Sequence, residues 1–353
     1  MSARERLNAE AAKRILITDG AFGTEIQNWK LSEADYAGTL GLAKDQKGNN
    51  DILALTMPKV PESIHRAYFE AGADIAETNT FSANRISQAD YAAEHLVREI
   101  NVESARLARR LADEFEAKDA KNGIWRPRFV AGAVGPTNKT LSLSPDVNDP
   151  GFREIDFDEL KDVYREQVDA LVEGGADFIL IETVFDTLNA KAGVMAAIEA
   201  GEALGRDLPI MLSMTLTDLS GRNLSGHTVE AFWHAIRHAR PVTIGLNCSF
   251  GAEQLRPHVK VLSELCDTLI MVYPNAGLPN ELGEYDELPA TTAGLVGEWA
   301  QAGQVNVLGG CCGSTPAHIK AIADGVRGLT PRALPTPAVR TRLAGLEPFT
   351  MAA

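Results

Sequence analysis

The chain has 353 residues, 45% of them hydrophobic and 23% charged, and carries a formal net charge of −14. This composition is typical of a globular protein with a large core, and the length suits two average domains or one α/β barrel with extensions. The acidic balance excludes the basic footprint of a nucleic-acid-binding protein and the polybasic patch of a membrane-surface protein.

Residues 1–14 are charged and helix-prone, and no apolar signal segment follows them. No apolar run approaches the length of a membrane span. We therefore expect a cytoplasmic protein. Thiols stay reduced in that compartment, so the four cysteines are expected to be metal ligands or buried thiols rather than disulfides.

Short apolar runs alternate with helical patterns along the chain. Eight runs are mostly apolar at successive positions, as in parallel strands that are covered on both faces. These runs are 15–20, 73–80, 128–135, 176–184, 209–216, 242–249, 268–275 and 305–312. The clearest helical patterns are 62–72, 158–174, 228–240 and 290–303. The alternation predicts an α/β fold, a (β/α)8 (TIM) barrel over residues 1–330.

Two segments lie outside this pattern. Residues 136–157, rich in Pro, Asn, Ser and Asp, follow the third strand and predict a lid or rim loop. Residues 331–353 carry four prolines and predict an extended tail rather than a barrel element.

Two adjacent cysteines, Cys311 and Cys312, stand between glycines at the end of the eighth predicted strand. Their Cα atoms are ~3.8 Å apart, too close for an ordinary disulfide. The flanking glycines predict a backbone that leaves the strand, so that both sulfurs converge. Cys248 ends the sixth strand, and strand ends of a barrel share one rim. Three thiolates there predict a zinc site with an open fourth position.

Three thiolates would leave a zinc centre with a net charge of about −1, a poor electrophile for water but a good docking point for a soft thiol. A thiol that coordinates zinc loses its proton. The pattern therefore favours alkylation of a thiol.

Other polar residues also end predicted strands and are candidates for the same site. They are Asp19, Glu77, Asn79, Glu182, Asn247 and Asn275. The turn 20–23 adds backbone N–H groups that are able to hold a carboxylate.

Three further residue types are not assigned to the site. Cys266 is expected in the middle of a helix as a small apolar residue. His234 and His238 have the spacing of a helical zinc pair, but no Glu stands beside the first and the helix is an outer one. We attach no role to His227.

Nine stretches carry a resemblance to a known family, in order and over nearly the whole chain. They are ITDGAFGTEIQ (17–27), NNDILALTMP (49–58), AYFEAGADIAETNTF (67–81), VGPTNKTLSLSPDVNDPGF (134–152), LIETVFDTLNAKA (180–192), SGRNLSGHTVEAF (220–232), IGLNCSFG (244–251), PNAGLPNELGEYD (274–286) and GGCCGSTPAHI (309–319). The chain resembles the homocysteine-binding module of cobalamin-dependent methionine synthase, within the zinc-dependent homocysteine S-methyltransferase family.

The resemblance implies a zinc held by Cys248, Cys311 and Cys312, with Asn275 in the fourth position before substrate arrives. It also implies that Asp19 and Glu182 hold the amino acid part of homocysteine. The carboxylate of homocysteine would be held by backbone N–H groups of the turn formed by Gly20, Ala21, Phe22 and Gly23. Glu77, Asn79 and Asn247 remain further candidates.

In the full-length synthase, folate and cobalamin modules follow this one. Here residues 331–353 resemble only the linker to a folate-binding module. We therefore expect methylcobalamin to be the methyl donor, presented by a separate cobalamin- and folate-binding chain.

Three alternatives remain open. Standalone relatives that use S-methylmethionine or betaine share the three cysteines. A non-catalytic module would bind zinc and homocysteine without turnover. A vicinal-dithiol redox protein would oxidise Cys311 and Cys312 without metal.

Overall fold

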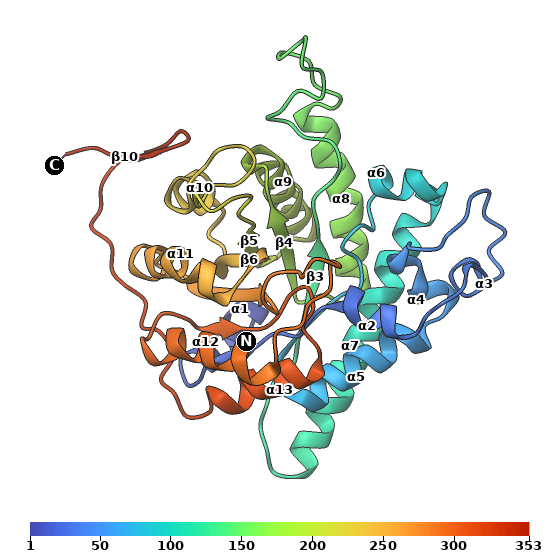
Figure 1. Cartoon of the computed structure of the whole chain (residues 1–353), viewed down its shortest axis with the longest axis horizontal. Helices are drawn as coiled ribbons and strands as arrows, with labels where there is room; N and C mark the ends of the chain where they lie inside the picture. The colour runs from blue at the N-terminus through green and yellow to red at the C-terminus, as the bar shows by residue number, and fades with distance from the viewer. Residues whose placement is uncertain (353) are drawn as a thin grey trace.

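The computed structural model describes residues 1–352, and its centre is a barrel of eight parallel strands (Figure 1). The strands are β1 (Leu16–Ile17), β2 (Ile75–Glu77), β3 (Phe129–Val134), β4 (Phe178–Val184), β5 (Ile210–Met214), β6 (Thr243–Gly251), β7 (Leu269–Asn275) and β8 (Val307–Leu308). From β2 to β8 each strand pairs with the next in the chain, and β8 pairs with β1. A bridge between Thr18 and Ile75 joins β1 to β2, so the (β/α)8 prediction is confirmed.

A helix follows each strand and contributes to an outer ring (Figure 1). These helices are α5 (Lys59–Ala71), α7 (Val97–Lys121), α8 (Phe157–Gly174), α9 (Thr187–Leu204), α10 (Val229–Ile236), α11 (Ala252–Leu265), α12 (Pro289–Gln301) and α13 (Pro316–Gly325). The four predicted helices are confirmed with shifted ends. The largest shift is in α10, which gives way to a 3-10 turn, η4 (Arg237–Ala239).

Short helical segments fill the loops after β1 and β2 and build one side of the barrel mouth. After β1 come α2 (Phe22–Asn28), α3 (Glu33–Ala37), η1 (Asn50–Ile52) and α4 (Leu53–Thr56). After β2 come α6 (Arg85–Gln88), η2 (Ala89–Tyr91) and η3 (Glu94–Leu96).

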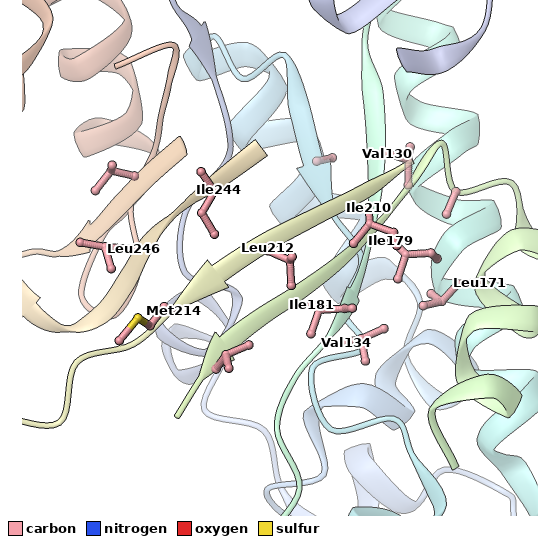
Figure 2. Packing of buried hydrophobic residues seen from close by; sticks show 14 of the residues in the cluster. Val130, Val134, Leu171, Ile179, Ile181, Ile210, Leu212, Met214, Ile244 and Leu246 are labelled. Carbon is pink, nitrogen blue, oxygen red and sulfur yellow. The ribbon is translucent and has the colours of Figure 1, made fainter. Parts of the chain in front are cut away.

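Alternating side chains along the strands divide the core into two layers, because neighbouring residues of a strand face opposite sides. Ile179 and Ile181 of β4 point outward with Leu212 of β5 toward the helices, as Figure 2 shows. Phe178 and Leu180 belong to the inner layer. Leu7 of the N-terminal helix α1 (Ala3–Ala11) joins that inner layer, so α1 packs against the barrel interior.

Strands β1 and β8 are shorter than predicted. The predicted runs 15–20 and 305–312 include the polar turn after Thr18 and the glycines before Cys311, where the ladder ends. These shortened strands leave the chain free to curl around the barrel mouth, which is where the candidate site lies.

Residues 136–157 form a long loop that projects beyond the N-terminal end of α8 in Figure 1. The root of this loop is tied to α9, since Asp186 accepts hydrogen bonds from the backbone and hydroxyl of Ser142. Only Asn138 of this loop reaches the central cavity. The loop is therefore a rim in this structure rather than a closed lid.

The tail differs from the predicted extended segment. It contains a short antiparallel hairpin, β9 (Arg342–Ala344) and β10 (Pro348–Thr350), which packs beside α10. Arg332 is buried near the amino-terminal end of β7. Its guanidinium donates to the backbone carbonyls of Ser263 and Thr268. No helix within residues 1–352 has the length and hydrophobicity needed to cross a bilayer.

Candidate metal centre and substrate cavity

A backbone irregularity at the end of β6 orients Cys248. The pairing of β6 with β7 shifts register between Asn247 and Gly251. Within that bulge Cys248 has φ of 60° and Ser249 has φ of 57°, a left-handed conformation that non-glycine residues adopt at a cost of about 1–3 kcal/mol. Strain of this kind clusters at functional sites.

Glycines at the end of β8 orient the other two cysteines. A Cβ atom on Gly309 would lie 2.2 Å from the Thr18 side chain, and one on Gly310 would lie 2.5 Å from Ser314, so only glycine fits at both positions. The Cys311 N–H then donates to the Pro274 carbonyl at 2.7 Å, beyond the β8 ladder. Strand β8 ends at Leu308, so the predicted end of the regular strand before the cysteines is confirmed.

The three sulfur atoms converge on one point. All lie within 4.8 Å of one another, and the Sγ atoms of Cys248 and Cys312 are 3.7 Å apart. Tetrahedral zinc with Zn–S bonds of about 2.3 Å requires sulfurs about 3.8 Å apart. The spacing therefore fits a zinc ion, which would sit at the wall of the cavity.

A candidate fourth donor ends β7, the strand between β6 and β8. The Asn275 side chain is buried, and its Oδ1 has no hydrogen-bond partner within the described part of the chain. Its Nδ2 donates to the Tyr285 hydroxyl at 3.4 Å. An unpaired buried carbonyl oxygen is costly, and coordination to a metal would satisfy it.

The three thiols lie close enough to shift one another's pKa. Hydrogen bonding to Cys248 raises the pKa of Cys311 well above its usual range and lowers the pKa of Cys312 to about 3. Three thiolates this close together repel one another and share their protons when no cation is bound. A divalent cation would allow all three thiols to ionise.

Three carboxyl groups form a second cluster. Burial raises the pKa values of Asp19 and Glu77 well above their usual range, with further contributions from the charge of Glu182. Burial likewise raises the pKa of Glu182 to about 7, although the Tyr273 hydroxyl donates to it at 3.3 Å. Such a cluster is stabilised by a bound cation.

Both clusters border one cavity of about 940 Å³ at the carboxyl ends of the strands. The predicted residues that line it are Gly20, Ala21, Phe22, Gly23, Glu77, Asn79, Glu182, Cys248, Cys311 and Cys312. Asp51, Asp90 and Glu284 add further carboxyl groups, and none of the described lining residues is Lys, Arg or His. The cavity thus favours positively charged groups.

Three predicted residues are buried behind the cavity wall instead. Asp19 accepts a hydrogen bond from the backbone N–H of Glu77 at 3.0 Å. Asn247 bonds the Thr183 hydroxyl at 2.8 Å and lies 3.9 Å from the sulfur of Cys311. Asn275 is the third, with the unpaired oxygen described above. In this structure Asp19 and Asn247 support neighbouring cavity residues.

The turn 20–23 and Asn79 are partly occupied by protein contacts. The Ala21 N–H donates to the Ser314 hydroxyl at 3.2 Å, and the next residues open helix α2. Amides of a first helical turn have no acceptor within the helix, so those of Phe22 and Gly23 suit a carboxylate. Asn79 donates to the Asn50 carbonyl at 2.7 Å and shapes the far wall.

Sequence reasoning missed three cavity residues, Tyr273, Tyr285 and Asp51. Tyr273 lies inside an apolar strand, where the sequence does not distinguish a cavity residue from a core residue. Tyr285 belongs to a loop, and its side chain packs so closely on Gly313 that a Cβ at residue 313 would lie 2.2 Å from it. The stretch PNAGLPNELGEYD, which follows the seventh strand, was the available signal for Tyr285.

The residues set aside lie elsewhere. Cys266 directly follows α11 rather than lying within a helix, a correction to the prediction, and it is buried as expected. His234 and His238 are not part of the cysteine cluster, the only group of potential metal ligands of this kind in residues 1–352. The Nδ1 atom of His227 contacts the Ser225 hydroxyl at 3.1 Å.

The sequence profile of the homocysteine S-methyltransferase family matches residues 16–326. The chain belongs to this family. The fold is similar to that of the homocysteine methyltransferase MmuM from Escherichia coli in three solved forms. The metallated form has a TM-score of 0.67 at 24% identity, covering 88% of this chain and 96% of that one. The oxidized form gives 0.68 at 24% identity over 88% and 95%, and the apo form 0.62 at 23% over 88% and 96%.

Proposed function

We propose that this family member is a zinc-dependent homocysteine methyltransferase that forms methionine. The observation that supports this most strongly is the juxtaposition of three convergent thiols with a buried carboxyl cluster in one cavity. A substrate with a thiol at one end and an ammonium group at the other matches both clusters.

Cys248, Cys311 and Cys312 would hold the metal, with Asn275 as a ligand that the substrate displaces. Zinc, when bound, would take the substrate's sulfur and keep it deprotonated at neutral pH. Asn275 suits an exchangeable position because an amide oxygen is a weaker ligand for zinc than a thiolate.

The carboxyl cluster would bind the substrate ammonium. Glu77 and Glu182 border the cavity, and Asp19 holds the backbone of Glu77 from behind. Arrival of the ammonium would allow these acids to ionise and would fix the substrate at both ends. Such two-point fixation places the sulfur for reaction.

As methyl donor we propose methylcobalamin carried by a separate chain. The support is the resemblance of stretches 49–58, 134–152 and 274–286 to the cobalamin-dependent branch. The substrate sulfur would form a bond to the methyl carbon, and the carbon–cobalt bond would break with both electrons left on cobalt. The proton of the thiol would leave to solvent on substrate binding.

A second candidate donor is a sulfonium such as S-methylmethionine. The observation that favours it is the acidic cavity, which attracts cationic groups. In that case the bond from the methyl carbon to the positive sulfur breaks, and the leaving group is a neutral thioether.

The test gives zinc-loaded protein homocysteine with methylcobalamin, S-methylmethionine or betaine in separate reactions and measures methionine by chromatography. We expect product from methylcobalamin and none from the Cys311→Ala protein. If S-methylmethionine or betaine gives methionine and methylcobalamin does not, the proposed donor is wrong and the active compound takes its place. Homocysteine binding without product from any donor, including methylcobalamin on a cobalamin-binding protein, would favour a non-catalytic module.

A further inference from the structure

A second cavity, of about 780 Å³, lies at the amino-terminal ends of β6 and β7, the end of the barrel opposite the cysteines. Its walls come from α1, from α10 with the turn that follows it, and from the tail around residues 334–342. None of these segments lines the proposed methyl-transfer site, so the two cavities are separate.

This cavity gathers positive charge on a chain whose net charge is −14. Its described lining contains seven basic side chains and one acid. They are Arg4, His234, Arg237, His238, Arg240, Arg340, Arg342 and the acid Asp267. Arg4 pairs with Asp207 at 2.7 Å and Arg237 with Asp267 at 3.1 Å.

The remaining three arginines are not neutralised. Arg240, Arg340 and Arg342 form no ion pair with any carboxylate in residues 1–352. They come from two segments about a hundred positions apart in the chain, and folding brings them to one cavity. Like charges repel when they are gathered without counterions, so a bound anion would relieve this repulsion.

His234 provides an independent sign of a missing ligand. Its side chain is only 1% exposed, and neither ring nitrogen has a hydrogen-bond partner in the described residues. The nearest carboxylate oxygen, on Glu230, lies 3.5 Å from Nε2. Glu230 can pair with Nε2 when the ring is protonated, but Nδ1 has no polar partner in the described residues, so an anion oxygen in the cavity would satisfy it.

We propose that this cavity binds a phosphorylated small molecule. Guanidinium groups match phosphoryl oxygens in charge and geometry, so Arg240, Arg340 and Arg342 would hold the phosphoryl group. His234 would donate to it. The volume is that of a small-molecule site, and the exposed side chain of Leu334 offers apolar surface to the remainder of the ligand. Because Arg340 and Arg342 belong to the tail, the ligand would also fasten the tail to the barrel.

Calorimetric titration of the zinc-loaded 353-residue chain with inorganic phosphate, pyrophosphate and ADP tests this proposal. We expect saturable binding of pyrophosphate or ADP at or below about 1 mM. Tighter binding of ADP would show that the apolar wall accepts a nucleoside, and equal binding would show that the phosphoryl groups suffice. No saturable binding of any of the three probes would overturn the proposal.

Variants assign the binding to this cavity. Arg240→Ala/Arg340→Ala should raise the Kd roughly tenfold or more, because charged hydrogen bonds to phosphate are lost. The matched control is Arg98→Ala/Arg106→Ala, two exposed arginines of α7 that should leave the Kd unchanged. An equal effect of both double variants, or none of either, would overturn the assignment. Zinc content is measured in every sample to exclude chelation by the probes.

Discussion

Among single residues, Glu182 makes the most direct test of substrate binding. Glu182→Gln keeps the shape of the side chain and the contact with Tyr273 but removes the charge that would face the substrate ammonium. We expect the KM for homocysteine to rise roughly ten- to a hundredfold, as for loss of a charged hydrogen bond of about 1.5–3 kcal/mol. Zinc content should not change.

The control for this variant is Glu284→Gln, the same substitution at an exposed carboxylate of the cavity. Its KM should stay near that of the parent protein. Equal KM values for the Glu182 variant and the parent would show that the ammonium binds elsewhere.

Asp51 allows a prediction of pH dependence. Burial raises its pKa from 3.8 to about 7, although it accepts a hydrogen bond from the Ser82 N–H. Between pH 4 and 7 the unfolded chain ionises this group more readily than the folded chain, so its contribution to stability falls as pH rises through that window.

Asp51→Asn keeps an acceptor for Ser82 and removes the titration. Raising the pH from 4.5 to 7 should lower the unfolding free energy of the parent protein relative to that of the variant. We expect this relative change to be on the order of a few kcal/mol. Urea unfolding at both pH values measures it, and zinc-dependent effects cancel in the comparison. A difference that is the same at both pH values would show that Asp51 is ionised in the folded state.

At the scale of secondary-structure elements, the end of β8 links barrel closure to the metal centre. A Cβ on Gly309 would meet Thr18 at 2.2 Å and the Asp19 carbonyl at 2.9 Å, forcing β8 away from β1. Gly309→Ala should destabilise the fold by about 1–3 kcal/mol and reduce the bound zinc. Denaturant unfolding and a colorimetric zinc assay measure the two effects.

Gly294→Ala is the matched control, since Gly294 lies within α12 and has open space around it. Alanine favours a helix there by about 1 kcal/mol, so stability should hold or rise. If Gly309→Ala kept full stability and zinc, the close approach of β8 and β1 would not control the site.

Strand order and the convergence of the cysteines were predictable from the sequence, because buried parallel strands are apolar along their length and barrel strand ends share one rim. The limits of β1 and β8 were not, because Asp19 and the glycines of GGCCG directly follow apolar runs and no pattern marks where the backbone leaves the ladder. The burial of Asp19 behind Glu77 was likewise hidden, because it depends on a hydrogen bond between two strands that are remote in sequence.

At the scale of the whole molecule, net charge was a poor guide to local charge. The acidic total led us to expect no basic site, yet the tail and the residues after α10 bring unpaired arginines together. The same tail was predicted as a free extension and instead is anchored by Arg332 and ends in a hairpin beside α10. Such long-range placement has no periodic signal in the sequence.

Arg332→Ala tests how far the tail belongs to the barrel. The loss would leave the buried carbonyl of Cys266 and the part-buried carbonyls of Ser263 and Thr268 without this donor. We expect a decrease in the free energy of unfolding on the order of 2–4 kcal/mol in a denaturant titration. The surface variant Arg327→Ala should change stability by less than about 0.5 kcal/mol. Equal small effects would mean that the tail contributes nothing to the fold.

The most direct test of the central proposal is zinc X-ray absorption on the purified protein with and without homocysteine. We expect one zinc per chain with three sulfur ligands and one oxygen or nitrogen ligand, changing to four sulfur ligands when homocysteine is added. An unchanged coordination shell, or a Cys311→Ala protein that still holds its full zinc with the same ligands, would contradict it.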